Sequence, residues 1–275
     1  MKITFLGTGT SQGIPIIACS CEVCQSVDPR DKRLRASILI EIGEQKFVVD
    51  AGPDFRQQML KANMKRLDAI LLTHEHVDHL FGLDDIRAFN WVQKHPTDIY
   101  AEERVQNAIK RVFNYVFANY KYPGIPQMNL HLIENKPFTI GDTEIIPIRG
   151  LHYKLPVYGF RIGKMAYLTD VNSIPAEEKE KLKGLDIFII NALRKEEHIS
   201  HFTLDQAIQL INELKPKKAF LTHISHQMGF HNEVSKELPP NVYLAFDGLE
   251  IELQTLHSGV NQHPDSNKKQ QKHCQ

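Results

Sequence analysis

Cysteine is scarce in this chain, which has four cysteines among 275 residues. Three of them, Cys19, Cys21 and Cys24, lie within six residues, and the fourth, Cys274, is the penultimate residue. A disulfide framework in a protein of this size needs several dispersed cysteine pairs, so this distribution argues against one. We therefore expect a cytoplasmic protein whose clustered cysteines are metal ligands.

The sequence also lacks net charge and long apolar runs. Lys plus Arg and Asp plus Glu both number 33, so no global basic field would gather nucleic acid. No run of about 18 apolar residues is present, which argues against a membrane-spanning helix. The opening MKITFLGTGTSQG is interrupted by Gly, Thr and Ser, so we expect a strand and a turn there rather than a signal peptide.

Short apolar or alternating stretches predict many strands. They cover residues 2–6, 37–42, 46–49, 68–72, 144–148, 157–162, 164–168, 186–190, 219–221, 242–245 and 249–253. Helical patterns cover residues 55–62, 84–92, 102–120, 176–183 and 204–214. Strands with interspersed helices, but too few regular strand–helix–strand repeats for a barrel, predict an α/β protein with two sheets and helices outside.

The expected helix at 102–120 has an apolar stripe, which predicts packing on the core. A lid or a contact between two copies in a homodimer is the alternative. After residue 257 the chain is polar and without periodicity. We therefore expect one domain over residues 1–257 and a disordered tail over 258–275.

Histidine, in contrast, is plentiful and clustered, with 14 in all. The sequence LLTHEHVDHL places His74, His76, Asp78 and His79 directly after an apolar strand. Imidazole nitrogens and a carboxylate oxygen suit zinc, manganese or iron, provided that the loop wraps one point. The alternative to a metal site is that these four are unrelated polar residues on an exposed loop. Glu75, which alternates with the histidines, is not expected to be a ligand.

The pattern His-x-His-x-Asp-His after a strand resembles the signature of the metallo-β-lactamase superfamily, whose αββα sandwich agrees with the expected elements. The resemblance implies three more ligands at strand ends: His152 in IRGLHYKLP, Asp170 in MAYLTD and His223 in AFLTHIS. It also implies that Asp50, in VVDAGPDF, orients the ligand loops from behind. The other histidines without such context, His95, His131, His198 and His257, are expected to be surface or internally hydrogen-bonded residues.

By the same resemblance, the seven ligands form a dinuclear centre. One divalent ion, zinc or manganese, would be held by His74, His76 and His152, the other by Asp78, His79 and His223, with Asp170 bridging. Two ions about 3.5–4 Å apart lower the pKa of a shared water and clamp the oxygens of an in-line displacement. This implies hydrolysis without a cysteine or serine nucleophile.

Three features favour a phosphodiester substrate. Asp170 stands where the lactamases of the superfamily often have a cysteine. The sequence SHFTLDQAI resembles the His-Ser-Thr motif of the transfer-RNA 3′-processing family, with Phe202 in place of the Ser. The segments FLGTGTSQGIPIIACSCEVC, LPVYGFRIG and AFDGLEI resemble the phosphoribosyl cyclic phosphate phosphodiesterase family of the carbon–phosphorus lyase pathway, and this likeness extends to about Leu253.

The expected activity is therefore hydrolysis of a small cyclic or strained phosphodiester by a metal-bridging hydroxide. Asp78 and His201 are the expected catalytic residues, with His201 protonating the leaving oxygen. Arg56 is expected to pair with phosphate or to form a salt bridge with Asp50 or Asp54. A transfer-RNA 3′ endonuclease and an inactive metal-binding scaffold are the alternatives. The neutral charge argues against the first, and the complete ligand set against the second.

The cysteine loop needs a fourth ligand to hold a structural zinc. Cys274 lies in the expected disordered tail, so its use would require ordering that whole segment. His226 follows His223 by three residues and stands where the resembled family has its fourth ligand. We therefore expect Cys19, Cys21, Cys24 and His226 to bind one zinc, with His231 as the second choice.

Overall fold

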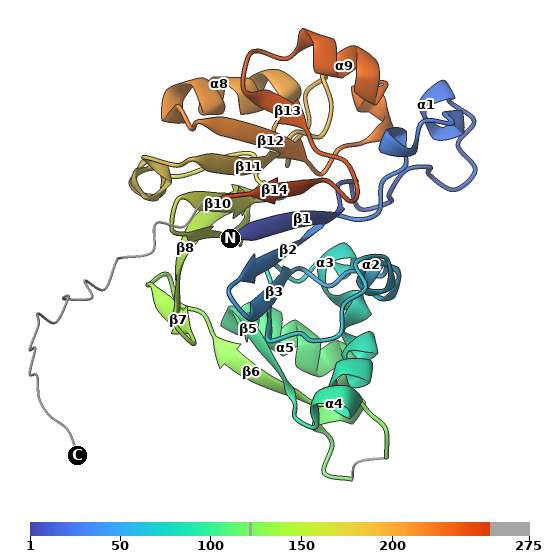
Figure 1. Cartoon of the computed structure of the whole chain (residues 1–275), viewed down its shortest axis with the longest axis vertical. Coiled ribbons are helices and arrows are strands. Elements are labelled where there is room, and N and C mark those ends of the chain that lie inside the picture. Colours follow the sequence, from blue (N-terminus) through green and yellow to red (C-terminus); the bar gives the residue numbers. More distant parts are fainter. Residues whose placement is uncertain (121–122, 254–275) are drawn as a thin grey trace, which may run out of the picture.

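Two β-sheets packed face to face form the described part of the chain, residues 1–120 and 123–253, in this computed structural model (Figure 1). The first sheet has seven strands in the order β14-β1-β2-β3-β4-β5-β6, and β3 to β6 run parallel. Its strands are β1 (Lys2–Gly7), β2 (Ser37–Ile42), β3 (Gln45–Val49), β4 (Ala69–Leu71), β5 (Thr97–Ala101), β6 (Met128–Leu132) and β14 (Glu250–Glu252).

The second sheet also has seven strands, in the order β13-β12-β11-β10-β9-β8-β7. Strands β10 to β13 run parallel, and β7 to β10 form an antiparallel meander. The strands are β7 (Phe138–Ile140), β8 (Thr143–His152), β9 (Leu155–Ile162), β10 (Met165–Leu168), β11 (Ile187–Asn191), β12 (Lys218–Thr222) and β13 (Val242–Leu244).

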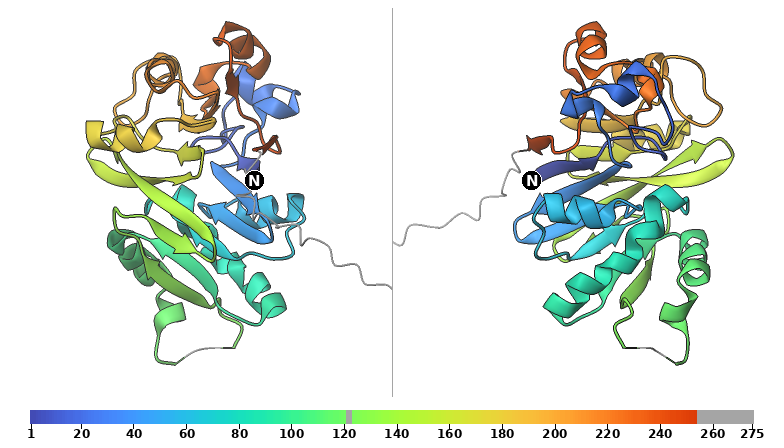
Figure 2. Two further views of the ribbon diagram at one scale, coloured as in Figure 1. Left: turned by 60° about the vertical axis from the view of Figure 1, so that its left-hand side comes forward. Right: turned by 90° about the vertical axis from the view of Figure 1, so that its right-hand side faces the viewer.

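Helices cover the outer face of each sheet (Figure 2). On the first sheet lie α2 (Phe55–Lys61), α3 (Val77–Leu80), the 3-10 helix η2 (Phe81–Ile86), α4 (Arg87–Gln93), α5 (Glu103–Val112) and α6 (Asn114–Phe117). On the second lie α7 (Ala176–Lys179), η3 (Glu180–Leu182), α8 (Leu204–Leu214) and α9 (His231–Glu237). The remaining short helices are α1 (Glu22–Gln25), η1 (Pro29–Asp31) and η4 (His226–Met228).

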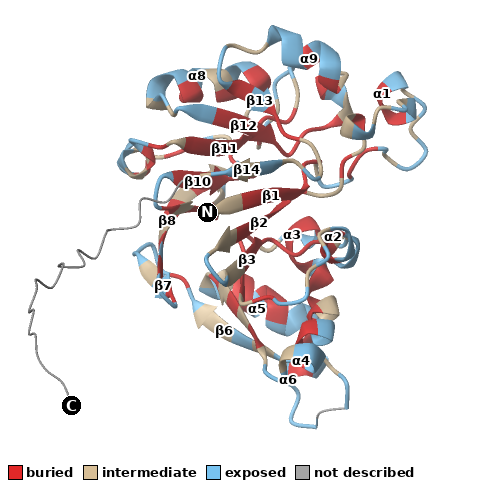
Figure 3. Cartoon of the chain, in the orientation of Figure 1, coloured by how far each residue is buried: buried red, intermediate tan, exposed pale blue. Residues whose placement is uncertain are grey.

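The central strands are buried on both faces, as Figure 3 shows. In β3, Phe47 and Val49 pack between the sheets, while Val48 packs under the helices of the first sheet. In β4, Ala69 packs inward and Ile70 outward. Strand side chains alternate between faces, so a strand with apolar neighbours on both sides reads as a continuous apolar run. The prediction of an αββα sandwich is confirmed.

Three strands, β5, β6 and β7, were not predicted. Strand β5 alternates buried and half-buried residues in TDIYA, and β6, MNLHL, has no fully buried residue. Strand β7 has three residues. Each is too short or too polar to stand out as a strand in the sequence, and each is specified by pairing with its neighbour in the sheet.

The helix expected at 102–120 is shorter than predicted. Helix α5 ends at Val112, and Phe113 adopts φ −105° and ψ 43° before the single turn of α6. Its ring is buried with Val105, Ile109 and Val116. The break at Phe113 therefore leaves the buried apolar stripe continuous from α5 to α6. The interpretation of the stripe as core is confirmed for these residues, whereas a lid or dimer role stays untested.

None of the helices within residues 1–120 and 123–253 has the length and apolar character needed to cross a membrane. The expected tail at 258–275, with Cys274, lies outside the described residues, as does His257. The domain boundary at 257 therefore stays a prediction.

Candidate metal centre

The loop after β4 brings four predicted ligands together. Strand β4 ends at Leu71, and α3 begins at Val77, so the loop turns back on itself within a few residues. The ring centroid of His74 lies 4.6 Å from that of His76 and 4.2 Å from that of His79. The loop is therefore compact enough to bring its ligand side chains to one point, as a metal site requires.

The other three predicted ligands come from the second sheet. His152 is the last residue of β8, Asp170 follows β10 by two residues, and His223 directly follows β12. The donor atoms of His74, His76 and His152 lie within 4.8 Å of one another, and so do those of Asp78, Asp170 and His223. A third group, His74, His79 and Asp170, connects these two. The structure thus gathers all seven predicted ligands, with Asp170 shared between groups. We call these seven residues the histidine centre.

Three residues at this edge of the sheets have a left-handed backbone that is uncommon outside glycine. The φ angles are 64° at Asp50, 57° at Asp170 and 54° at His223. Such conformations cost about 1–3 kcal/mol each and persist where the surrounding structure fixes them. Each follows a strand by no more than two residues. The bend ends the strand abruptly and places the side chain at the site.

Asp50 holds the His74–His79 loop from behind. Its buried carboxylate accepts hydrogen bonds from Thr73 N (2.9 Å) and Thr73 Oγ1, and Asp50 Oδ2 lies 2.7 Å from His79 Nδ1. The adjoining Gly52 is needed for close approach, because a Cβ there would lie 1.9 Å from the carbonyl oxygen of Asp78. Asp50 therefore lies where the sequence places it, behind the ligands.

Several ligand imidazoles are hydrogen-bonded at Nδ1 and open at Nε2. His74 Nδ1 contacts Thr73 Oγ1 at 2.9 Å, and His152 Nδ1 contacts the carbonyl of Ser200 at 2.9 Å. In the described part of the chain, Nε2 of His74 and Nε2 of His223 are buried without a hydrogen-bond partner. A buried polar atom without a partner is costly, and imidazole nitrogens backed by an oxygen are typical metal ligands. The donor set fits divalent ions.

Burial and the clustered charges also fit a cation site. Nε2 of His79 lies 3.1 Å from Asp78 Oδ2 and 3.2 Å from Asp170 Oδ2. Burial opposes its charge, but Asp78 and Asp50 outweigh it and raise the pKa of His79 well above the ordinary value. Burial likewise opposes ionisation of Asp170, yet His223 and His79 hold its pKa well below the ordinary value. The centre is therefore built around ionised carboxylates.

Burial keeps other ligands in the neutral form that binds metals. It lowers the pKa of His152 to about 4, with the nearby Asp170 opposing, and lowers the pKa of His74 well below its ordinary value. A neutral imidazole has a free lone pair near pH 7. Metal binding at these two residues therefore need not displace a proton.

His201 lies at the same centre. Its Nε2 is 2.9 Å from Asp170 Oδ1, and its donor atom groups with those of His152 and Asp170. Its Nδ1 is 3.1 Å from Nδ1 of His198, which the sequence analysis treated as a surface or satisfied histidine. The signal for His198 was its spacing of three residues from His201 in HISH. By contrast, His131 is bonded to Asp98, away from the centre, as expected.

The three clustered cysteines lie around His226, the residue expected to be the fourth ligand. Its Nδ1 lies 3.4 Å from Cys19 Sγ, 3.2 Å from Cys21 Sγ and 3.6 Å from Cys24 Sγ. A tetrahedral zinc with bonds of about 2.3 Å to sulfur and 2.0–2.1 Å to nitrogen separates these atoms by about 3.6 Å. The backbone N–H of Cys24 lowers the pKa of Cys21 to about 6, which favours the thiolate that binds zinc.

Two of the sequence alternatives are not supported. Nδ1 of His231, the second choice for the zinc, faces the guanidinium of Arg33 at 3.2 Å rather than the cysteines. Arg56 is exposed on α2 and forms no ion pair among the described residues, because Asp54 binds Arg35 at 3.0 Å. Asp50 in turn contacts Thr73 and His79 of the ligand loop.

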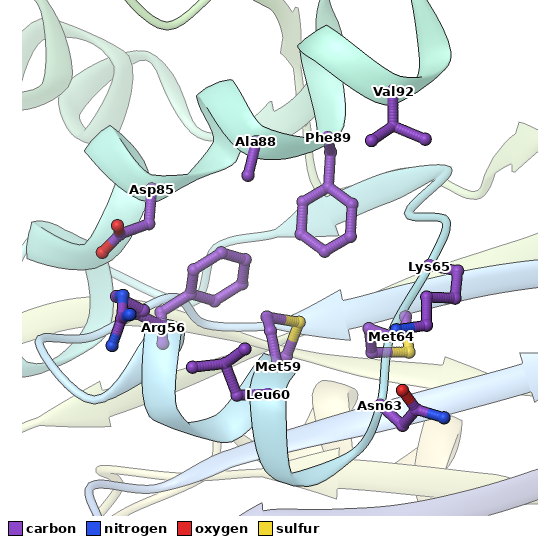
Figure 4. A pocket seen from close by; sticks show the side chains of 11 residues that line it. Arg56, Met59, Leu60, Asn63, Met64, Lys65, Asp85, Ala88, Phe89 and Val92 are labelled. Carbon is purple, nitrogen blue, oxygen red and sulfur yellow. The ribbon is translucent and has the colours of Figure 1, made fainter.

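Arg56 instead lines a cavity of about 410 Å³ between α2 and the η2–α4 segment (Figure 4). Its wall is mostly apolar, and Phe55, Met59 and Phe89 contribute to it. None of the predicted metal ligands lines this cavity. The pocket and the histidine centre are therefore separate features.

These sites predict the metal content of the protein. Protein purified without chelator should contain about three metal ions per chain, two at the histidine centre and one zinc at the cysteines. Elemental analysis measures this directly. One ion or none, at full occupancy, would contradict a dinuclear centre, whereas dialysis against a weak chelator should first remove metal from the histidine centre.

Comparison with known proteins places this chain in a family. The family model described as "Beta-lactamase superfamily domain" matches residues 45–224. An "Octanoyltransferase" of Porphyromonas gingivalis is 44% identical over 254 residues, which cover 91% of this chain and 51% of that protein. A "Ribonuclease Z" of Nostoc punctiforme is 26% identical over 191 residues, covering 68% of this chain and 52% of that protein. The chain thus spans about half the length of these curated relatives.

Solved structures agree with this placement. A structure titled "Crystal Structure of a New Diphosphatase from the PhnP Family" has a TM-score of 0.86 and 39% identity, covering 92% of this chain and 98% of that one. Zinc-bound PqqB from Methylobacterium extorquens, at 20% identity and a TM-score of 0.76, shares the fold over 92% of this chain and 100% of its own. With its sandwich fold and its histidine centre, the chain belongs to the metallo-β-lactamase superfamily of hydrolases, close to the PhnP family.

Proposed function

We propose that this protein hydrolyses a phosphodiester bond in a small molecule, using two divalent ions at the histidine centre. The observation that supports this best is the position of Asp170, whose carboxylate lies within 3.2 Å of nitrogens of His79, His201 and His223. A carboxylate shared by two groups of ligands suits two like cations side by side. When bound, such ions lower the pKa of water and neutralise the charge of a phosphate.

The residues of the chain have separate tasks in this proposal. Asp50 and Thr73 fix the ring orientations of His79 and His74, so the donors are in place before the ions bind. His201 donates a proton to the departing oxygen, because it is buried at the centre and its imidazole is within reach of Asp170. Neither step needs a serine or cysteine nucleophile.

A small cyclic or strained phosphodiester is the proposed substrate. The similarity to a diphosphatase of the PhnP family supports phosphorus chemistry. The balance of 33 basic and 33 acidic residues supports a small molecule rather than nucleic acid. The ribonuclease Z relatives, which are 24–26% identical, keep a transfer-RNA 3′ endonuclease as the second candidate.

The name octanoyltransferase describes a relative about twice as long as the match, so we do not extend acyl transfer to this chain. Acyl transfer through a covalent intermediate needs a free nucleophile. The three described cysteines all face His226. We propose instead that the transferase activity of that relative belongs to the half that this chain does not match.

A substrate panel tests the proposal. Metal-loaded protein should hydrolyse bis-(p-nitrophenyl) phosphate and a cyclic ribose phosphate, with the cyclic compound preferred in kcat/KM. A precursor transfer RNA and an octanoyl thioester complete the panel. Preferred cleavage of the transfer RNA would favour the second candidate, and preferred hydrolysis of the thioester would contradict phosphodiester chemistry. A protein that binds its metals but hydrolyses none of the four would be the scaffold that the sequence left as an alternative.

A further inference from the structure

A row of charged side chains lies beside the histidine centre without contributing a predicted ligand. It consists of Glu75 in the His74–His79 loop, Glu102 and Arg104 at the start of α5, and Arg149 on β8. Arg104 pairs through Nη1 with Glu75 and through Nη2 with Glu102 at 3.3 Å. Arg149 extends the row by binding the other oxygen of Glu102 at 2.9 Å. From the sequence, Glu75 was expected not to be a ligand, and nothing was expected of Arg104.

Arg104 contacts both segments that supply one group of predicted ligands. Glu75 lies between His74 and His76, so a contact that holds its carboxylate also restrains the backbone of that loop. Nη2 of Arg104 also donates to the carbonyl of Pro156 at 2.5 Å. Pro156 pairs with Leu151 in the β8–β9 hairpin, one residue before His152. A single guanidinium thus ties the His74–His76 turn to the strand end that carries His152.

The ligand His76 depends on this tie more than its partners do. His74 and His152 have Nδ1 contacts that fix their rings. Among the described residues, no side-chain hydrogen bond holds the ring of His76, which is exposed. Its position is therefore set by the backbone on either side. Glu75 is the adjacent side chain that anchors this backbone, and its other oxygen, Oε2, is buried without a partner.

The forked shape of the arginine is suited to this task. A guanidinium presents several donors in one plane, so it can bind a carboxylate and a carbonyl at once, which a lysine ammonium cannot do with the same rigidity. Side-chain exposure is 34% for Arg104 and 20% for Glu75, so water screens the pair only in part. The contact of Arg104 with Glu75 is an ion pair, and its contact with the carbonyl of Pro156 is a hydrogen bond.

We propose that Arg104, acting through Glu75 and Pro156, is a positioning residue for the metal site formed by His74, His76 and His152. It sets the distance between the loop after β4 and the end of β8. In the described part of the chain, Arg104 forms no ion pair or hydrogen bond with Asp78, Asp170 or His223 of the other group. The inference rests on the metal centre of the proposed function, but not on the identity of the substrate.

The test measures metal binding rather than turnover. Wild-type protein and the variants Arg104→Ala and Glu75→Gln are equilibrated against buffers of stepped free zinc, and the zinc retained per chain is determined. Both variants should need about 10–100-fold more free zinc to retain one of the ions, the range found for residues behind a metal ligand. The remaining ions should be held as in wild type, and the cysteine thiols should stay protected from a thiol reagent.

Matched variants separate positioning from folding. Arg87→Ala removes an arginine that pairs with Asp84 on the outer helices and should leave all zinc affinities unchanged. The double variant Glu75→Gln with Arg104→Ala should be no weaker than Arg104→Ala alone, because the two side chains act through one contact. Zinc retention equal to wild type in Arg104→Ala would overturn the inference, as would parallel weakening of every ion.

The wild-type arm keeps this inference distinct from the proposed function. Wild-type protein that retains a single zinc would refute the dinuclear centre itself. Wild-type protein that retains three ions but hydrolyses no phosphodiester would refute the proposed function and leave the role of Arg104 to be decided by the variants.

Discussion

Replacing His201 with alanine should reduce hydrolysis of an alkyl phosphodiester by about 10²–10⁴-fold while leaving hydrolysis of a p-nitrophenyl ester nearly unchanged. The reason is the leaving group. An alkoxide needs a proton as it departs, whereas p-nitrophenolate leaves without one. His201 is buried at the centre with Nε2 2.9 Å from Asp170 Oδ1, so it is placed to supply that proton. Paired kcat/KM values for the two substrates, with metal content, measure the effect.

The pH profile gives a second readout of the same role. Burial lowers the pKa of His201, although the hydrogen bond to Asp170 opposes this. A general acid works only when protonated, so kcat/KM for the alkyl ester should fall as pH rises through this pKa. That limb should be absent from the alanine variant and from the p-nitrophenyl profile.

The outcomes that contradict this role are distinct. Equal loss on both substrates would indicate phosphate binding. Loss of an ion would make His201 a ligand, a real alternative because its donor atom lies within 4.8 Å of those of His152 and Asp170. His131→Ala, which removes an imidazole that contacts Asp98 and stacks on Tyr100, should change the hydrolysis of neither substrate.

Replacing His226 with alanine should remove one zinc per chain and lower activity by up to about 10–100-fold, although His226 does not touch the histidine centre. The link is short. Ile224, between His223 and His226, donates its N–H to the carbonyl of Thr8 and accepts from the N–H of Thr10. A zinc bound by the cysteines and His226 would therefore tie the N-terminal loop to the segment that positions His223. Elemental analysis, thiol reactivity and kcat/KM measure the three consequences.

Two variants serve as controls for the zinc site. His231→Ala should retain the zinc, since its ring faces Arg33 rather than the cysteines. Cys274→Ser should change neither zinc content nor activity. The assignment of His226 is wrong if the Cys274 variant loses the zinc and the His226 variant keeps it.

The sequence predicted the buried strands well because their apolar runs are specified on both faces. Strand β3 contains the run FVV and β4 is AIL, and all of these residues are buried. Strands β5 and β6 of the same sheet were not predicted, because they lack a continuous apolar run. Strand β6 is half-buried and polar in places, so only its pairing with β5 reveals it. The end of α5 was missed because the buried apolar spacing continues through Phe113 and Val116, past the point where the helix breaks.

The ligands outside the His74–His79 loop were predictable only through the family resemblance, which directs attention to ligand-type residues at strand ends. His152, Asp170 and His223 all meet that description, and the structure brings them to the His74–His79 loop. Arg104 was not predictable, because an arginine near the start of a helix carries no signal of its partners. Its role depends on the distance between two segments that only the fold brings together.

Both metal sites draw on residues far apart in the chain. The histidine centre takes its first donors from the loop at 74–79 and its last from His223, and the cysteine site runs from Cys19 to His226. During synthesis, the cysteine site and the group of Asp78, Asp170 and His223 cannot be complete until the segment at 223–226 has left the ribosome. We therefore expect loading with the full set of metals to be a late event in synthesis, and a prematurely terminated product that stops short of β12 would lack both His223 and His226.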